Sequence, residues 1–308
     1  MLAYTTRRLL QLIPTVLVVS LFVFVLFGMI PGSAITAGNV DQLDPVMVER
    51  LRQEFGLDQP LYMRYAEFVG NLASGDFGTS LTTRQPVSDL LLPRIWPSLK
   101  LAIFAMMIAI AVGVPLGFVA GIKRGSWVDT AATVVAVSGT SMPQFWLGLL
   151  LMYLFAVTLN WLPASGYGDG GLRYLILPAI SLGFAFMALL ARTTRTAVVE
   201  ILHADYIRTA NAKGLSRLAV YGKHVLRNAM MLIVTTAGLQ FGAIMGKSVI
   251  IEKLFGWQGV GALLLDSIVG RDLPTAQACI VVMILFFILV NLAVDLLYRV
   301  IDPRVEYK

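Results

Sequence analysis

The sequence has little charge, one cysteine and two histidines. Only 14% of its residues are charged, against about 25% in an ordinary soluble domain. The single cysteine, Cys279, cannot form a disulfide or a thiolate metal site within the chain. The histidines, His203 and His224, are far in sequence from any acidic cluster suited to a metal. These shortages argue against a soluble domain and against a metal-dependent enzyme.

Two signatures of enzyme chemistry are missing as well. A phosphate-binding loop needs Gly-x4-Gly-Lys-Ser/Thr after a strand. The segment ending in Gly246-Lys247-Ser248 lies in an apolar helical pattern, and Phe241 occupies the position of the first glycine. No Gly-x-Ser-x-Gly nucleophile motif occurs either. We therefore expect a chain that is not an enzyme, hydrolyses no ATP and binds no cofactor of its own.

The chain is instead rich in long apolar runs. Hydrophobic residues make up 57% of the sequence, and the mean hydropathy is +0.78. A helix needs roughly 20 mostly apolar residues to cross a bilayer, and these runs lack the alternation of barrel strands. The sequence therefore predicts an all-α membrane protein with six transmembrane helices. The expected spans are Leu9–Ile30, Leu99–Ile122, Thr133–Leu159, Leu175–Ala191, Asn228–Ile251 and Ala276–Val300.

Lysine and arginine collect on one side of these spans, as in membrane proteins whose inner loops are basic. The outer loops contain only Arg173, Lys253 and Arg271 among their short segments. The net charge of +6 thus reflects membrane topology rather than a nucleic-acid surface. With the N-terminus inside, the inner basic residues are Arg7, Arg8, Lys123, Arg124, Arg192, Arg195, Arg208, Lys213, Arg217, Lys223, Arg227, Arg299, Arg304 and Lys308.

The segment 31–97 is polar enough to lie outside the membrane, and we expect a small helical extracytoplasmic cap. Asp44-Pro45 and Gly56 would bound its first helix. Apolar residues at helical spacing from Leu61 to Leu72 predict a second. We accordingly divide the chain into residues 1–96, which hold the first span and the cap, and residues 97–308, which hold the membrane core.

Between the fourth and fifth spans, within the basic segment 192–227, lies the stretch Asp205–Ser216, which we call the elbow. Asp205 is expected to cap a helix running through Lys213, with Gly214 in the left-handed conformation and Ser216 capping a second short helix. The side chains at Thr209, Ala210 and Gly214 are small, so another protein could approach the backbone closely. The alternative is a basic helix held at the membrane surface by anionic lipid.

The fifth span has two distinct faces. Its polar residues and its glycines separate at 100° per residue. The polar set suits a translocation path or hydrogen bonds between helices, and the glycines suit close helix packing, as do Gly113, Gly117 and Gly121 of the second span. Lys247 is nearer the outer end, where it could snorkel or pair with Glu252. The polar set is Thr236, Gln240 and Lys247, and the glycines are Gly238, Gly242 and Gly246.

Taken in order, a series of short motifs resembles a known family. The chain is similar along essentially its whole length to the B-type membrane subunits of the dipeptide/oligopeptide group of ATP-binding-cassette (ABC) importers, whose relatives include glutathione and nickel permeases. The motifs are Arg7-Arg8-Leu9, Ile13-Pro14, Pro31-Gly32, Phe55-Gly56-Leu57-Asp58-Gln59-Pro60-Leu61, Gly75-Asp76-Phe77-Gly78, Trp161-Leu162-Pro163, Leu177-Pro178-Ala179, His224-Val225-Leu226-Arg227-Asn228-Ala229, Arg271-Asp272-Leu273-Pro274, and Asn291 with Asp295 through Asp302-Pro303-Arg304.

This resemblance implies the type I importer fold and a role for the elbow. In that family the elbow is the "EAA" loop, whose coupling helix docks in a cleft of the ATPase subunit. The motif's Glu-Ala-Ala and glycine fall on Arg208, Thr209, Ala210 and Gly214. Arginine for glutamate departs from the general motif, as do Leu232 for proline and Gln258 in place of the proline of Trp-Pro-Gly. The implied coupling residues are Asp205, Arg208, Thr209, Ala210, Lys213, Gly214, Leu215 and Ser216.

The resemblance also implies partners and a membrane. They are a second homologous permease, two ATP-binding subunits that carry ATP and Mg, and an external solute-binding protein. The chain would form half of the pathway for peptides, glutathione, a nickel complex or a related solute. It would lie in the bacterial inner membrane with both termini cytoplasmic. The alternative class, an ion-gradient-driven secondary transporter, favours midspan acids and inverted repeats, which the expected spans lack.

Reporter fusions test the orientation. A reporter placed after Gly214 should behave as cytoplasmic and one inserted near Asn71 as external, because lysine and arginine orient the spans. Labelling with the opposite sidedness would overturn both the orientation and the role of the elbow.

Overall fold

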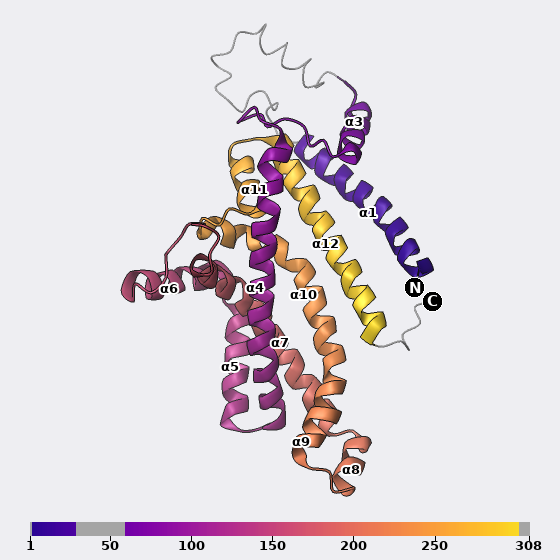
Figure 1. Cartoon of the computed structure of the whole chain (residues 1–308), viewed down its shortest axis with the longest axis vertical. Helices are drawn as coiled ribbons and strands as arrows, with labels where there is room; N and C mark the ends of the chain where they lie inside the picture. Colours follow the sequence, from indigo (N-terminus) through magenta and orange to yellow (C-terminus); the bar gives the residue numbers. More distant parts are fainter. Residues whose placement is uncertain (1, 29–58, 302–308) are drawn as a thin grey trace. The chain divides into compact units, whose positions relative to one another are not determined.

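The computed structural model describes the backbone of residues 2–28 and 59–301 and the side chains of residues 13–26 and 59–294. These residues form helices, and the only β-pairing among them is a single bridge between Thr79 and Pro86. The expected all-helical class is confirmed. The principal helices (Figure 1) are α1 (Leu2–Gly28), α3 (Leu61–Ser74), α4 (Val87–Ile122), α5 (Trp127–Ser141), α6 (Gln144–Leu151), α7 (Leu172–Leu202), α8 (Asp205–Ala212), α10 (Arg227–Leu254), α11 (Val260–Val269) and α12 (Leu273–Ile301).

Four helices in the described part of the chain are long and apolar enough to cross a membrane, or five if one bent pair counts as a span. They match the expected second, fourth, fifth and sixth spans. The first expected span coincides with α1, but its apolar stretch with described side chains, Ile13–Leu26, is too short to be counted. The number six therefore stays a prediction.

The third expected span, Thr133–Leu159, is not one straight helix. It consists of α5 and a second segment, α6 followed by a π-helix at Met152–Thr158, and the two segments meet at 108°. Met142 is extended, with ψ of 127°, and Pro143 follows it. A proline disfavours helical backbone in the residue before it. Pro143 thus breaks the span. The hydropathy of the sequence does not reveal this break, because the residues on both sides of Pro143 are apolar.

The chain divides into two compact units, the first comprising Met1–Ser98 and Gln258–Ile288. In this unit α1 packs against α3 through Phe24, whose ring lies 5.5 Å from that of Tyr65. Helix α3 is the expected second cap helix, and it ends at Gly75 in the left-handed conformation. The expected first cap helix, at Asp44–Gly56, lies outside the described residues.

In the same unit a buried carboxylate, that of Asp272, binds two segments that are far apart in the sequence. Asp272, only 4% exposed, accepts hydrogen bonds from the hydroxyls of Ser80 (2.5 Å) and Thr275 (2.8 Å) and from the amide of Leu81 (3.0 Å). Three donors offset the cost of burying the charge. The turn before α4 is thereby fastened to the start of α12.

The second unit comprises Leu99–Trp257 and Leu289–Lys308, and α7 is its central helix. Helix α7 contacts α5, α6 and α10, and its apolar stretch is mostly buried. Glycines bring α4 close to it. A Cβ atom built on Gly113 would lie 2.6 Å from the carbonyl oxygen of Met187, and one on Gly121 would lie 2.7 Å from Val198. The glycine spacing of the second span therefore marks a real backbone contact.

Gly117 provides the test of this contact. The variant Gly117→Ala should lower the free energy of unfolding by about 1–3 kcal/mol, because the new methyl group would overlap the carbonyl of Ala191 and push α4 away from α7. Gly70→Ala on α3 is the matched control, since a Cβ there meets no atom within 4 Å. Thermal unfolding of the purified protein measures both. Equal stability of the two variants would contradict the close packing.

Candidate functional site

The elbow folds around two local signals that the sequence provides. Gly214 has a φ of +74°, and the Ser216 hydroxyl accepts a hydrogen bond from the amide of Ala219 at 3.3 Å, so both predicted roles are confirmed. The predicted cap at Asp205 is wrong. Ala204 occupies the N-cap position without a side-chain cap, and Asp205 lies in the first turn of α8. There its charge still interacts favourably with the helix dipole.

The second elbow helix is not a separate short helix. It begins with α9 (Arg217–Ala219), continues as the π-helix η3 (Val220–Leu226) and runs on into α10, so Arg217–Leu254 forms one continuous candidate span. The side-chain amide of Asn228 donates a hydrogen bond to the backbone carbonyl of His224 at 2.6 Å and so supports the junction between η3 and α10. Any force on the elbow therefore acts directly on the fifth span.

One face of α8 is packed into an apolar cluster. Ile207 and Ala210, which are 2% and 6% exposed, lie in a core shared with Val198 of α7 and with Val225 and Ala229 at the start of the fifth span. Ala210 is therefore not a small surface residue that a partner could approach, as the sequence suggested. Ala210 lies three residues after Ile207 and therefore on the same helical face. This spacing was the sequence signal that Ala210 is buried together with Ile207. The cluster fixes α8 to α7 and α10 (Figure 1).

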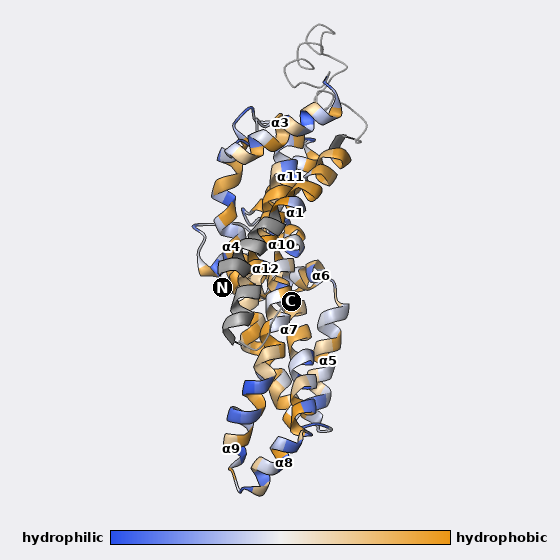
Figure 2. Cartoon of the chain, turned by 90° about the vertical axis from the view of Figure 1, so that its right-hand side faces the viewer, coloured by the Kyte–Doolittle hydropathy of each residue, from blue (hydrophilic) through white to orange (hydrophobic). Residues whose placement is uncertain are grey.

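The opposite face of the elbow is open. Tyr206 is 46% exposed, Leu215 43% and Leu218 84%, and Gly214 has no neighbouring atom within 4 Å of a built Cβ. Figure 2 shows a mixture of hydrophilic and hydrophobic colours on α8, whereas hydrophobic colours predominate on α11. Leu218 was not among the predicted site residues, because its exposure depends on how α9 leaves the turn.

Charged groups on the elbow are solvated. Arg208 pairs with Asp205 at 3.6 Å, but their side chains are 76% and 97% exposed. Such a pair contributes little to stability. Thr209, the remaining motif residue, donates its hydroxyl to the carbonyl of Asp205 at 3.0 Å. The guanidinium of Arg208 is therefore available to an incoming partner.

An ion pair ties α5 to α7 above the elbow. Arg195 donates to both carboxylate oxygens of Asp129, at 2.5 and 2.8 Å. Asp129 also accepts from the amide of Gly125 at 3.0 Å. A two-point arginine–carboxylate contact is stronger and more directional than a single bond. From the sequence alone Arg195 is only one of the basic residues expected on the inner side, because Asp129 lies 66 residues away and no local pattern pairs the two.

The three predicted path residues all lie on α10 but differ in environment. Thr236 and Gln240 are half-buried, and the Thr236 hydroxyl donates to the carbonyl of Leu232 at 2.9 Å. Lys247 is exposed, and its ammonium lies 4.9 Å from the centre of the Phe186 ring on α7. A cation–π contact of this kind holds the lysine toward α7.

The glycine face of α10 is packed along only part of its length. A Cβ built on Gly238 would overlap Val294 of α12, whereas one built on Gly246 meets no atom within 4 Å. Gly242 is buried and Gly246 exposed. Close packing, which the glycine spacing suggested, is therefore not found at Gly246 among the residues that the structure describes.

Comparison with known proteins identifies this arrangement. Residues 113–307 match the family described as "Binding-protein-dependent transport system inner membrane component", and residues 1–102 match the corresponding N-terminal family. The chain belongs to this family. It is a multi-pass membrane permease of an ABC importer, and the comparisons give no support to an ion-driven secondary transporter.

Several relatives align with the permease from end to end. It is 46% identical over 308 residues, 100% of both chains, to the "Glutathione transport system permease protein GsiC" of Escherichia coli (strain K12). The protein of the same name from Shigella dysenteriae serotype 1 (strain Sd197) is also 46% identical over 100% of both chains.

Solved structures share the fold of the permease. A chain of the MetNI methionine ABC transporter in an inward-facing conformation superposes with a TM-score of 0.59 at 18% identity, covering 69% of this chain and 96% of that one. A structure described as an amino acid ABC transporter with histidines gives a TM-score of 0.56 at 14% identity, covering 69% and 94%. The type I importer permease fold is therefore confirmed.

Two neighbouring residues test the two-faced elbow. Ile207→Ala should destabilise the packing of α8 by about 2–4 kcal/mol, because it removes a buried side chain from the cluster. Tyr206→Ala, on the open face, should leave that packing intact. Hydrogen exchange of the α8 amides measures both, and faster exchange in the Tyr206 variant alone would reverse the assignment of faces.

Proposed function

We propose that the permease carries short peptides, or a peptide-like solute such as glutathione, inward across the bacterial inner membrane. The end-to-end similarity at 46% identity to permeases named for glutathione transport supports this solute class. In this proposal a second homologous permease supplies the other half of the pathway, and an external binding protein delivers the solute. Two cytoplasmic subunits bind ATP with Mg and hydrolyse it, and this chain performs no covalent chemistry.

The elbow is the proposed contact with an ATPase subunit. The observation that carries this proposal is its division into a packed and an open face. Ile207 and Ala210 anchor α8 to α7 and α10, while Leu215 and Leu218 are exposed beside Gly214. An apolar anchor surrounded by polar groups is typical of interface centres. Movement of the ATPase would then reach the fifth span through packed side chains.

The individual coupling residues take different parts in this proposal. Gly214 and Ser216 set the turn, and Ala210 holds α8 in place. Asp205 lies in the first turn of α8, where its charge interacts favourably with the helix dipole. Leu215, together with Leu218, enters an apolar cleft of the ATPase. The exposed basic groups favour an acidic rim around that cleft, which would steer association and fix orientation. The exposed basic residues that would face the rim are Arg208, Lys213 and Arg217, and Thr209 is exposed beside Arg208.

The proposed transport cycle is alternating access. A ligand or nucleotide can shift a conformational equilibrium only through contacts that differ between the two states. Contacts at the elbow would change as the ATPase subunits close and reopen, and Thr236 and Gln240 would face the solute path on one side of α10. Lys247, held toward Phe186, would lie nearer the outer end. Both chain termini are placed in the cytoplasm, and residues 97–308 form the transporting core beneath the cap.

Substitution at Gly214 tests coupling. Gly214→Trp should abolish uptake and co-purification of the ATPase while the permease stays in the membrane, because a large side chain at the open turn blocks docking and strains positive φ. Gly214→Ala separates these causes, since it brings strain without bulk, and should retain most coupling. Gly70→Trp is the control, because that site also has open space.

Uptake and co-purification must be measured together. Normal uptake and a normal complex in Gly214→Trp would remove the elbow from the mechanism.

Cysteine accessibility tests the transport path. After replacement of the native Cys279, cysteines at Thr236 and Gln240 should react with a small hydrophilic thiol reagent, and the rate should change when ATP traps the partner. A cysteine at Gly238 should be shielded or should disrupt assembly, because Val294 packs against that position. If cysteines at Thr236 and Gln240 are protected from the reagent in every state, these positions do not line the path. Hydrogen bonding between helices would then be the favoured interpretation of the two polar side chains.

A further inference from the structure

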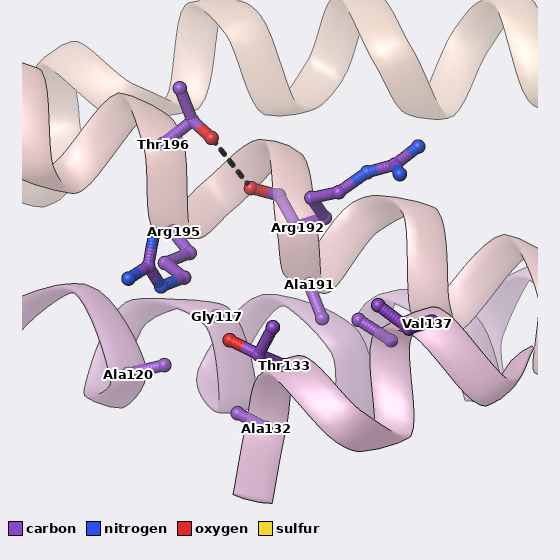
Figure 3. A pocket seen from close by; sticks show the side chains of 10 residues that line it. Gly117, Ala120, Ala132, Thr133, Val137, Ala191, Arg192, Arg195 and Thr196 are labelled. Atoms are coloured by element: carbon purple, nitrogen blue, oxygen red, sulfur yellow. Dashed lines mark hydrogen bonds between the residues drawn. The ribbon is translucent and has the colours of Figure 1, made fainter. Parts of the chain in front are cut away.

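A lateral hollow of about 280 Å³ lies in the second unit between α4, α5 and α7. Its walls are small side chains: Gly117 and Ala120 of α4, Ala132 and Ala136 of α5, and Ala191 of α7. Figure 3 shows Ala191 directed toward the α5 residues across the hollow. The glycine contact brings α4 and α7 together, and the alanines leave space where α5 joins them. The volume is at the small end for ligand pockets, which span about 300–1,000 Å³.

The hollow lies near the polar ends of these helices. Helix α4 ends at Ile122, only two residues after Ala120, and α5 begins at Trp127. The Asp129–Arg195 ion pair closes the same end. Val134 and Val137 on α5 are 59% and 53% exposed. In a membrane protein this places an apolar groove at the level where acyl chains meet headgroups.

Two arginines of α7 reach this region, and they are not equivalent. Arg195 is engaged by both oxygens of Asp129. Arg192 is exposed, lines the same hollow and makes no ion pair with any residue whose side chain the structure describes. Figure 3 shows the two side chains extending from α7 in opposite directions. The mouth of the hollow therefore carries one uncompensated guanidinium, with the hydroxyls of Thr133 and Thr196 among the lining side chains.

We propose that this hollow binds an anionic phospholipid, with part of one acyl chain along the alanine wall and the phosphate on Arg192. An apolar groove facing hydrocarbon is filled by lipid at no cost in desolvated polar groups. Arginine suits a phosphate because its planar fork donates two hydrogen bonds to adjacent oxygens. Basic pockets between helices at the cytoplasmic side are suited to anionic headgroups. A helix from a second permease would fill the apolar part but would need an acidic side chain at the mouth of the hollow to match the guanidinium of Arg192.

The lipid would hold α5 against α7, with Arg192 about three turns before the end of α7 at Leu202. It would act alongside the Asp129–Arg195 pair, so the inner ends of three spans would stay together while α8 is pulled. This role is independent of the solute and of how the ATPase docks. Loss of the lipid site would therefore leave co-purification of the ATPase unchanged.

Native mass spectrometry of the complete transporter, extracted from membranes of phosphatidylethanolamine with a minor fraction of phosphatidylglycerol, tests the proposal. The wild type should retain phosphatidylglycerol in preference to phosphatidylethanolamine. Arg192→Gln should lower that preference by about fivefold, the effect of one basic residue near a charged lipid surface. Arg192→Lys should keep most of it, and Lys123→Gln, an exposed cation outside the hollow, should not change it.

A second variant keeps the charge and fills the space. Val137→Trp, at an exposed position on the wall, should expel the bound lipid although Arg192 is intact. Unchanged phosphatidylglycerol retention in both Arg192→Gln and Val137→Trp would overturn the proposal. So would efficient cross-linking of a cysteine at Thr133 to a second permease subunit, because a protein helix would then occupy the hollow.

Discussion

In the proposed mechanism, coupling between the ATPase and the permease depends on the apolar cluster that joins α8 to α7 and α10. Without Ile207 and Ala210 in that cluster, the elbow would be a short polar segment too small to be a stable helix alone. The cluster also spans η3, since Val220 and Val225 belong to it together with Ala229 and Ile233 of α10. Helices often kink at π-helical turns, and packing on both sides of η3 opposes bending there. The elbow and the N-terminal half of α10 are therefore packed together through one apolar cluster, and we propose that they move as one body.

Close helix contacts extend this body along the membrane. Gly113, Gly117 and Gly121 let α4 approach α7 at backbone distance, and Arg195 holds the start of α5 to the same helix through Asp129. In lipid the hydrophobic effect does not drive helices together, so such contacts and polar ties must do so. Helix α7 is thus the element from which the elbow, the fifth span and the lipid-sized hollow take their positions.

Local chemistry explains what the sequence predicted correctly. Gly214 and Ser216 are tied to particular backbone states, so their roles were readable without a fold, and the long apolar runs revealed four spans directly. Predictions that depended on tertiary packing were weaker. Ala210 faces the core and Leu218 faces solvent because of how α8 and α9 leave the turn, and a Cβ built on Gly246 meets no atom within 4 Å. The break at Pro143 was visible in the sequence, but continuous hydropathy on both sides masked it. Helix α8 begins at Asp205, one residue earlier than expected, so Ala204 occupies the N-cap position. A shift of one residue is common at helix ends.

The central claim is that the elbow and α10 move as one body when the ATPase acts. The most direct test is the distance between spin labels at Asn211 on α8 and Leu239 on α10, two exposed positions, in the complete transporter with Cys279 replaced. Pulsed electron paramagnetic resonance would compare the nucleotide-free and ATP-trapped states. If the elbow and α10 move as one body, the distance distribution should be the same in both states, because the intervening cluster stays packed. A shift of several ångströms between them would show that η3 bends and would contradict direct transmission from the elbow to the fifth span.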